Sequence, residues 1–389
     1  MKLRAKQRLD ACAGGLAIIL LKPFARVLGL VLHRDHDIRP KGDIVILKML
    51  GGGSLVLAYP ALLGLKRAYP ERELRLVCTG ATRPFAELLG IFDEIHSVDD
   101  GGSLLKLLGS SFTTLRAVFR CDTMIDLEVY SRLSTIFCLL TLARNRISFY
   151  LDTAYWRKGL ATHLFYFNRS GSAPMHYAQI ARELGAEIPD ADKCRSAFLA
   201  ANAIALRNPK SDGPERIGLA CFCSDLALER MFSASEWGDL LAREMKGRDI
   251  SITLFGGPGD REAGEEMAAS IRTALPGVTV ENACGRWPLK ETAAEIAKMD
   301  RFWSIDTGLL HIARQIGVPT TSFWGPTAPH TLLQDLPGTD EAVHYSELPC
   351  SPCVHVHDEP PCGGTRPCMV AHLRELTAEE RNPAWVARS

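Results

Sequence analysis

The sequence has no excess of charge of either sign, because 45 lysines and arginines balance 45 aspartates and glutamates. A chain without net positive charge has no global attraction for nucleic acid, so nucleic acid is not expected as a partner. No tandem repeat is visible either. With 389 residues, 47% of them hydrophobic, the chain is long enough for two domains with their own cores and too apolar to be disordered.

A signal-peptide cleavage pattern is also missing, so we expect a reducing compartment, in which most of the 12 cysteines are small core residues. The apolar segment 11–33 lacks the uninterrupted run of about 20 residues that spans a bilayer, since Lys22, Pro23 and Arg26 interrupt it. Basic residues precede it at positions 2, 4, 6 and 8. Residues 1–33 are thus predicted to lie on an anionic membrane surface as an interfacial or re-entrant segment. The alternative is a helix buried against its own domain.

Short apolar strands alternate with amphipathic helices along most of the chain, and this order predicts an α/β fold of parallel sheets covered by helices. A polar stretch with two prolines and five charges, RNPKSDGPER, separates two such series. We therefore predict an N-terminal segment with a linker (1–42), a first domain (43–206), an interdomain linker (207–216), a second domain (217–345) and a cysteine-rich tail (346–389).

The most informative stretch of the chain is DTGLLHIARQIGVPTTSFWGPTAP, which begins at Asp306. Its order predicts a turn, a helix, a strand and a second turn, Gly325 to Thr327. Backbone N–H groups of Thr307, Gly308 and Leu309 are expected at the helix N-terminus, where anions bind. The side chains of Thr307 and His311 add donors. Two turns at the same end of a parallel sheet face one crevice, so the pattern predicts a diphosphate cradle.

This stretch, read as DTGxxHxA followed by GxPxxxxxGPTxP, resembles the C-terminal signature of glycosyltransferase family 9, the heptosyltransferase-like enzymes. A lone DTG also occurs in aspartic proteases, but those carry two such motifs on β-rich lobes. The resemblance implies the GT-B fold, in which two Rossmann-like domains with parallel sheets face a central cleft. It further implies inverting transfer of a sugar from a nucleotide-sugar donor, ADP-heptose-like, without a metal or other cofactor for catalysis.

Two further segments complete the predicted donor site in the second domain. The turn GGPGD contains Gly256, Gly257 and Asp260 after a strand, and the resemblance gives Asp260 the role of contacting the nucleoside. The alternative is that Asp260 caps the helix that follows. Arg230 lies seven residues before Trp237, where the family has a basic residue that binds a donor phosphate. The alternative for Arg230 is a solvated loop arginine.

The first domain departs from the family at the position of its general base. The resemblance places a Gly-Asp pair of the family on Gly53 and Ser54, and Ser54 cannot act as a carboxylate base. Gly52 and Gly53 still suit a bare backbone wall on the acceptor side. Asp126 and Glu128 end another strand and are the candidates for the missing base. The alternative for each acid is to cap the helix that starts near Ser131.

Two predictions concern residues outside these motifs. His176 stands where the family often has a histidine before a helix, and we interpret it as an acceptor-side or packing residue. The tail brings four cysteines into one segment, and the family often has a similar tail. These thiols predict a structural zinc site, with free packed thiols as the alternative. The four cysteines are Cys350, Cys353, Cys362 and Cys368.

Together these patterns predict a glycosyltransferase whose second domain holds the nucleotide sugar. The first domain would hold a lipid-linked or lipopolysaccharide-type acceptor at the cytoplasmic face of the membrane, which makes the protein a cytoplasmic, peripheral enzyme. Ser54 supports a second hypothesis, a non-catalytic homologue that binds a nucleotide sugar or acts as a scaffold. A third is a nucleotide-sugar epimerase of GT-B fold, which needs paired acids at the anomeric centre and no acceptor.

Overall fold

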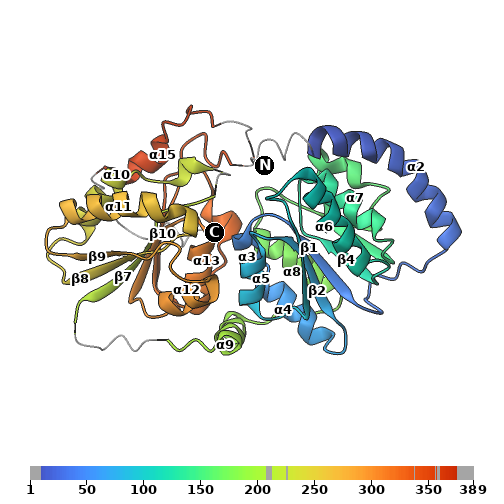
Figure 1. Cartoon of the computed structure of the whole chain (residues 1–389), viewed down its shortest axis with the longest axis horizontal. Coiled ribbons are helices and arrows are strands. Elements are labelled where there is room, and N and C mark those ends of the chain that lie inside the picture. Colours follow the sequence, from blue (N-terminus) through green and yellow to red (C-terminus); the bar gives the residue numbers. More distant parts are fainter. Residues whose placement is uncertain are drawn as a thin grey trace. The chain divides into compact units, whose positions relative to one another are not determined.

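The computed structural model describes residues 10–206, 213–224, 227–336, 338–354, 356 and 360–374 (Figure 1). Internal contacts divide the chain into two units, Met1–Cys194 and Arg195–Ser389. The predicted interdomain linker, 207–216, follows this boundary, and its residues 207–212 lie outside the described part of the chain.

The first unit contains one sheet of six parallel strands. These are β1 (Ile44–Lys48), β2 (Leu74–Thr79), β3 (Glu94–Val98), β4 (Thr123–Asp126), β5 (Asn145–Tyr150) and β6 (His163–Tyr166). Its helices are the π-helical turn η1 (Asp10–Gly14), α2 (Gly15–Leu32), α3 (Gly52–Leu57), α4 (Tyr59–Ala68), α5 (Arg83–Leu89), α6 (Leu104–Ala117), α7 (Arg132–Leu140), the 3₁₀ helix η2 (Asp152–Arg157) and α8 (Ala173–Glu183), followed by α9 (Ala191–Asn202).

The second unit also contains one sheet of six parallel strands. These are β7 (Glu215–Ala220), β8 (Ile250–Leu254), β9 (Thr279–Asn282), β10 (Arg301–Ile305), β11 (Thr320–Trp324) and β12 (Glu341–Tyr345). Its helices are η3 (Leu228–Arg230), α10 (Ala234–Glu244), η4 (Pro258–Asp260), α11 (Arg261–Ala274), α12 (Leu289–Ile296), α13 (Gly308–Ile316), α14 (Pro329–Leu332), α15 (Pro367–Val370) and η5 (Ala371–Leu373).

The two sheets have the same strand order. The first runs β3-β2-β1-β4-β5-β6 and the second β9-β8-β7-β10-β11-β12, all parallel. The direction of the order reverses between β1 and β4 and again between β7 and β10. In open parallel sheets, ligands bind outside the carboxyl ends of the strands at this reversal. The residues that follow these four strands are therefore the first place to look for a site in each unit.

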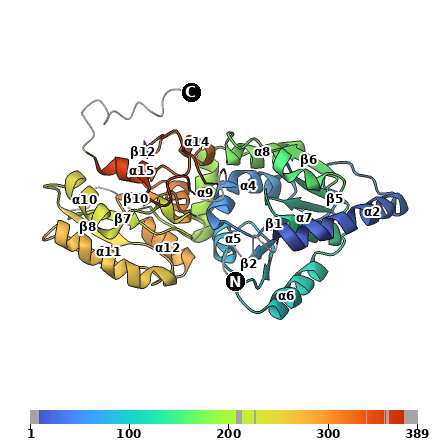
Figure 2. The ribbon, with the colours of Figure 1, turned by 90° about the horizontal axis from the view of Figure 1, so that it is seen from above.

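The central strands are apolar because helices cover both faces of each sheet, as in other parallel sheets. All five residues of β1, IVILK, are buried. In Figure 2, α8 lies on one side of the first sheet and α6 on the other. In the second unit, Trp237 of α10 is fully buried in a core cluster with residues of β7, β8, β10 and β11. These layers confirm the predicted α/β architecture.

The N-terminal helix α2 uses one face to pack on the first unit. Ile18 is buried in a cluster with Leu139 of α7 and Trp156 of η2. Ahead of α2, Asp10 accepts hydrogen bonds from Ser131 Oγ and from the N–H of Leu133, at 2.8 Å each, and so caps α7. The predicted alternative, a helix packed on its own domain, is thus realised on this face.

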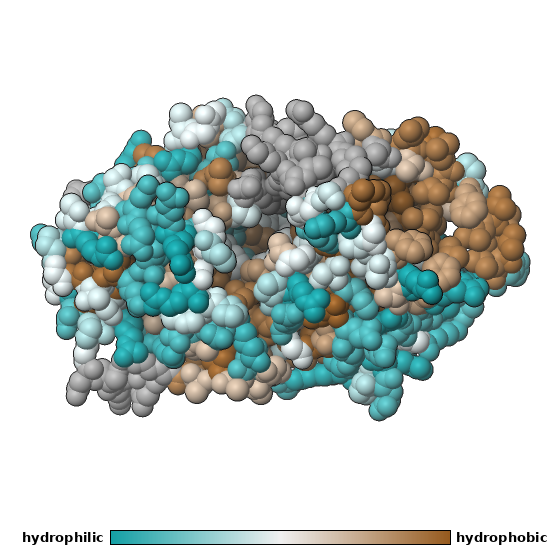
Figure 3. Space-filling model, in the orientation of Figure 1, coloured by the Kyte–Doolittle hydropathy of each residue, from teal (hydrophilic) through white to brown (hydrophobic). Residues whose placement is uncertain are grey.

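The opposite face of α2 is exposed and apolar, and Figure 3 shows hydrophobic side chains gathered over this helix. The helix is 18 residues long with a mean hydropathy of 2.0, and by length and composition it is apolar enough to cross a membrane. It continues through Pro23 without a break. The membrane-surface prediction for this segment stays a prediction. The large side chains exposed by half or more are Leu16, Ile19, Leu20, Phe24, Val27, Leu30 and Val31.

Candidate functional site

The N-terminus of α13 is the centre of the candidate site in the second unit. Strand β10 ends at Ile305, and Thr307 precedes the helix in an extended conformation, with a φ of −151°. No side chain caps this helix, and the N–H of Leu310 donates to the backbone oxygen of Thr307 at 3.2 Å, so the N–H groups of Gly308 and Leu309 are the ones left for an external acceptor. Thr307, Gly308 and Leu309 are half-buried. The helix dipole and these donors together favour an anion here.

Asp306 holds the charged side chains next to this helix end. Arg230 Nη1 donates to Asp306 Oδ2 at 3.2 Å and to its backbone oxygen at 2.8 Å. His311 Nε2 lies 3.6 Å from Oδ1. Burial alone would raise the pKa of Asp306, but the hydrogen bond from His311, the charge of Arg230 and a contact with Thr327 lower it to about 2. Asp306 is therefore an ionised acceptor that orients donors, and it is a poor proton acceptor.

The sequence spacing between Arg230 and Trp237 has a structural reason. Phe232 packs edge-on against Trp237, with ring centroids 5.0 Å apart, and both side chains are buried. Ser233 starts α10 through a reciprocal cap with Glu236. Arg230 also donates from Nε to the backbone oxygen of Ala227 at 3.1 Å. The arginine predicted as a solvated loop residue in the alternative is therefore fixed and 9% exposed.

The glycine turn after β8 brings Asp260 back onto its own backbone. Asp260 Oδ2 accepts a hydrogen bond from the N–H of Gly257 at 2.7 Å. A side chain at Gly256 would lie 2.8 Å from Cys284 Sγ, so only glycine fits there. Asp260 stands at the N-cap position of α11, but its side chain makes no hydrogen bond to that helix, so the capping alternative is not realised. The carboxylate of Asp260 thus holds its own turn in place. The contact of Asp260 with a nucleoside stays a prediction.

The turn Gly325 to Thr327 follows β11, and the tail of the chain supports it from behind. A side chain at Gly325 would lie 2.8 Å from Cys368. The N–H of Cys353 donates to the backbone oxygen of Pro326 at 3.0 Å. His372 Nε2 donates to the backbone oxygen of Trp324 at 2.9 Å. The tail thus fixes one of the two turns that were predicted to form the cradle.

The same tail also supports the loop that carries Arg230. Arg366 donates to the backbone oxygen of Met231 and pairs with Glu236, with its Nη1 3.2 Å from Oε2. Sequence reasoning missed Arg366 and His372, because neither belongs to a motif. Their position in the tail does not indicate that Arg366 contacts the loop next to Arg230 or that His372 contacts the end of β11.

The four tail cysteines are free thiols, and only Cys368 is buried. Among the described residues, no group of three or more His, Cys, Asp or Glu is arranged to hold a metal ion. Two histidines of the same segment, His355 and His357, could also ligate zinc, but they lie outside those residues. The zinc site stays a prediction, which metal analysis of the purified protein tests.

In the first unit, Glu128 anchors the loop that follows β1. Its Oε1 accepts hydrogen bonds from Lys48 Nζ at 3.0 Å and from the N–H groups of Met49 and Leu50 at 2.8 and 2.9 Å. Burial would lower the pKa of Lys48, but Glu128 raises it above its usual value, so the pair is ionic. Sequence reasoning missed Lys48, whose only indication was a charge at the end of a buried strand. Within the described chain, no hydrogen bond to Oε2 of Glu128 is recorded.

Asp126 lies at the end of β4 and is more deeply enclosed than Glu128. Its Oδ2 accepts from Ser134 Oγ at 2.8 Å and lies 3.4 Å from Arg157 Nη2, and its Oδ1 accepts from the N–H of Glu128 at 3.0 Å. Burial raises the pKa of Asp126 to about 6, although the charge of Arg157 opposes this. Asp126 contacts the first turn of α7 only through the hydroxyl of Ser134, and the backbone cap of that helix is made by Ser131 rather than by Asp126 as the alternative predicted.

The remaining predicted residues of the first unit lie on α3 and α8. Gly52 and Ser54 lie in the first turn of α3, and a side chain at Gly52 would collide with the ring of Phe85, at 2.2 Å. Gly53 lies between them in the same turn. His176 Nε2 donates to the backbone oxygen of Asn168 at 2.9 Å, and its ring packs on that of Phe167. The packing interpretation of His176 therefore has direct support.

Comparisons with known proteins show what the chain as a whole is similar to. The family model described as glycosyltransferase family 9 (heptosyltransferase) matches residues 177–362. A curated relative, lipopolysaccharide heptosyltransferase 2 of Escherichia coli K12, is 29% identical over 89 residues, 23% of this chain and 25% of the relative. The aligned part of the chain thus spans only a quarter of that relative's length. Lipopolysaccharide heptosyltransferase 1 of Pseudomonas aeruginosa is 32% identical over 117 residues, 29% of this chain and 30% of the relative.

The structural comparison covers more of the molecule. The structure of E. coli ADP-heptose heptosyltransferase II aligns with 85% of this chain and 98% of its own, with a TM-score of 0.59 and 16% identity. Two parallel six-stranded sheets of this kind define the GT-B fold, as predicted. The predicted resemblance is confirmed as well: over residues 177–362 the chain is similar to glycosyltransferase family 9, the heptosyltransferases.

Proposed function

We propose that the protein transfers a sugar from a nucleotide-sugar donor, ADP-heptose-like, to a lipid-linked or lipopolysaccharide-type acceptor. The observation that carries this proposal is the uncapped N-terminus of α13, next to the Arg230–Asp306 pair and His311. Charge builds on the diphosphate as it leaves the sugar. Preorganised N–H groups and a fixed guanidinium stabilise that charge without reorganisation. Arg230, the open N–H groups and His311 would serve this role without a metal.

The reaction proposed is an inverting displacement. An acceptor hydroxyl oxygen attacks the anomeric carbon while the bond from that carbon to the diphosphate oxygen breaks. The proton of the hydroxyl passes to a base in the first unit. Of the two candidates, Glu128 suits this role better, because its Oε1 is fixed by three donors and Oε2 has no recorded partner in the described structure. Asp126 has both oxygens engaged.

The membrane location belongs to the same proposal. The exposed face of α2 is apolar, and nearly all exposed large apolar side chains of the described residues lie in the first unit. A lipid surface would cover this face and bring a membrane-bound acceptor close to the first unit. We propose a peripheral position on the cytoplasmic face of the membrane. Replacing Leu20 and Phe24 with Asn tests it, because these side chains are exposed and their loss leaves the packed face intact.

One experiment addresses the donor directly. The purified protein is mixed with a panel of nucleotide sugars and free nucleoside diphosphates, and its melting temperature is recorded. A binder stabilises the folded state by RT ln(1 + [L]/Kd), so an ADP-sugar should raise the melting temperature in a concentration-dependent way. Incorporation of labelled sugar into a glycolipid acceptor then tests transfer. The absence of any shift with all donors would refute the donor site.

A second function is favoured by one observation, which is Ser54 at the position of the family's carboxylate base. A non-catalytic homologue would bind the nucleotide sugar through the second unit and transfer nothing. The same panel separates the two functions: binding with transfer supports the enzyme, and binding without transfer to any acceptor supports the scaffold.

A further inference from the structure

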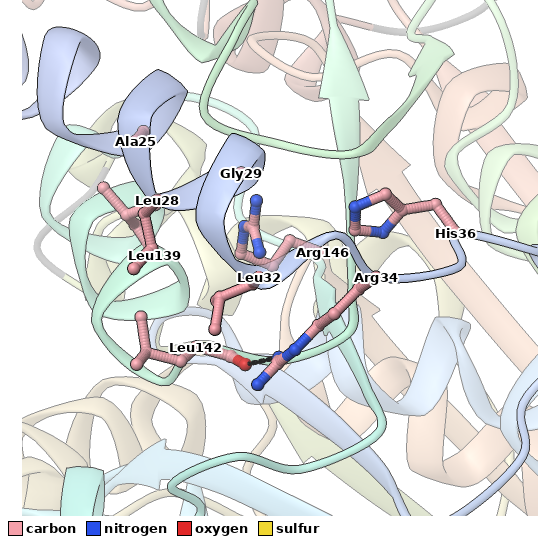
Figure 4. Close-up of a pocket in the computed structure, with 9 residues that line it drawn as sticks. All are labelled: Ala25, Leu28, Gly29, Leu32, Arg34, His36, Leu139, Leu142 and Arg146. Atoms are coloured by element: carbon pink, nitrogen blue, oxygen red, sulfur yellow. Dashed lines mark hydrogen bonds between the residues drawn. The ribbon is translucent and has the colours of Figure 1, made fainter.

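A cavity opens beneath the C-terminal half of α2, where this helix lies against α7 and β5 (Figure 4). Its volume is about 360 Å³, part of which is open to solvent. One side of the wall is apolar and the other is cationic. The lining residues are Ala25, Leu28, Gly29, Leu32, Arg34, His36, Leu139, Leu142 and Arg146.

The cationic side of the cavity contains two guanidinium groups and an imidazole, but no carboxylate lines it. Arg146 donates to the backbone oxygens of Leu160 and Ala143, at 2.9 Å each, and Arg34 donates to that of Leu142. Carbonyl oxygens satisfy these hydrogen bonds but carry no net charge. In the described part of the chain, no ion pair is formed by Arg34 or Arg146.

The neighbouring acids do not neutralise this site. Asp35 pairs with Lys41, and Asp122 pairs with Arg144. Burial lowers the pKa of Arg146, and the nearby charge of Arg34 lowers it further. Two like charges in a partly buried cavity repel each other, and an anion between them would relieve this repulsion. Simple capping of carbonyl groups does not require two arginines to line the same cavity.

We propose that this cavity binds the phosphate group of an anionic phospholipid, whose acyl chains lie along the exposed apolar face of α2. Guanidinium groups suit phosphate oxygens because they present paired donors in a plane. Leu28, Leu32 and Leu139 form the apolar wall of the cavity, on the side of α2. The phosphate would therefore contact the arginines, and the acyl chains would contact this wall and the exposed face of the helix. The inference rests on the proposed membrane attachment and adds a specific lipid class to it.

The test is a flotation assay of the full-length protein with two kinds of vesicle, phosphatidylcholine alone and phosphatidylcholine mixed with phosphatidylglycerol. We expect the wild type to prefer the anionic vesicles. Arg34→Gln should lower the partition onto them by about five-fold, the scale for one basic side chain near an anionic surface. Binding to the neutral vesicles should stay unchanged. Arg72→Gln is the matched control, because Arg72 is exposed on the same unit and does not line the cavity.

Two further variants keep the result interpretable. Arg146→Lys retains the charge and should retain most of the preference, whereas Arg146→Gln should lose it at an unchanged melting temperature. If Arg146→Gln has a lower melting temperature, the comparison of Arg34→Gln with its control Arg72→Gln decides alone. An equal loss of binding to anionic vesicles in Arg34→Gln and Arg72→Gln would overturn the proposal for the cavity, because it would show a diffuse charge effect. Wild-type binding to neither vesicle would instead refute the membrane attachment itself.

The source of the phosphate is tested separately. Inorganic phosphate is titrated into the protein without lipid, and the melting temperature is recorded for wild type and Arg34→Gln. A lipid site should show little stabilisation by millimolar phosphate, because the acyl chains are missing. Strong stabilisation that Arg34→Gln abolishes, with no preference among vesicles, would assign the cavity to a soluble phosphate and overturn the lipid proposal.

Discussion

The two units share one strand order but differ in the charged side chains that lie where the direction of that order reverses. In the second unit, one carboxylate, Asp306, collects Arg230 and His311 beside an uncapped nine-residue helix. In the first unit, two carboxylates each have their own cation: Glu128 pairs with Lys48, and Asp126 with Arg157. The following helix, α3, is only six residues long. The second unit therefore offers donors to an anion, and the first offers acceptors to a hydroxyl.

This difference shows that the backbone topology provides the place and the strand-end residues decide the chemistry. In open parallel sheets a ligand approaches the sheet at such a reversal, and each unit has one. An anion needs open N–H groups and fixed cations, and a proton acceptor needs a carboxylate whose second oxygen is reachable. Mutations that exchange or remove these charges therefore test the comparison directly.

The largest effect is expected for the acids of the first unit. Glu128→Gln should lower kcat by about 10²-fold or more, the scale of a lost general base, while donor affinity stays near that of the wild type. The amide oxygen of Gln can still accept from the N–H groups of Met49 and Leu50, so the loop should keep its position. Steady-state transfer kinetics and calorimetric donor titration measure the two quantities. Asp126→Asn is the matched variant and should be milder, because both of its oxygens are engaged.

Full turnover in both variants would show that neither Glu128 nor Asp126 is the general base. A parallel fall in donor affinity and melting temperature would instead show that Glu128 acts only by holding the loop after β1.

The next largest effect concerns the anion site of the second unit. Arg230→Ala and His311→Ala should each weaken binding of the nucleoside diphosphate by about ten-fold or more, since a charge-assisted hydrogen bond contributes about 1.5–3 kcal/mol. Calorimetry with ADP measures this. Arg230→Ala also leaves Asp306 buried without its cation, so Arg230→Lys separates charge from geometry. Arg301→Ala, at the opposite end of β10, is the control. Unchanged affinity in both site variants would contradict the cradle.

The comparison also shows what a sequence can predict. Asp306, Thr307 and His311 come together because they lie within six residues at a turn, where glycine and helical periodicity reveal the local structure. Lys48 and Glu128 are 80 residues apart, and Arg366 and Glu236 are 130 apart. Their pairing depends on how distant elements pack, and no local pattern reports it. The fold was therefore predictable, but the partners of the first-unit acids and the support from the tail were not.

A different kind of effect, on stability and not on binding or rate, is expected from pH through His372 in the second unit. Burial lowers the pKa of this histidine from its ordinary 6.5 to about 4. Between these values the unfolded chain binds a proton that the folded chain does not, so the free energy of unfolding falls as pH falls from 6.5 to 4 and is fully present above that window. The loss is on the order of 3 kcal/mol. Urea unfolding across this range measures it.

His372→Gln serves as the comparison, because glutamine does not titrate and its amide can donate to the backbone oxygen of Trp324. The variant should show a shallower fall in stability over the same range. Equal slopes would mean that other buried histidines, such as His344, carry the pH dependence.

The smallest effect is expected at Ser54, in the first turn of α3. Its hydroxyl has no useful acidity, so it can contribute at most a neutral hydrogen bond to the acceptor. Ser54→Ala should therefore lower kcat by less than about ten-fold, the scale of one such bond. Ser54→Asp restores the family's carboxylate and is the sharper test. If Glu128 already accepts the proton, a second carboxylate adds no rate and its charge should lower it. If the wild type transfers nothing and Ser54→Asp creates turnover, then the chain is the non-catalytic homologue, and the two units differ because only the second has kept its chemistry.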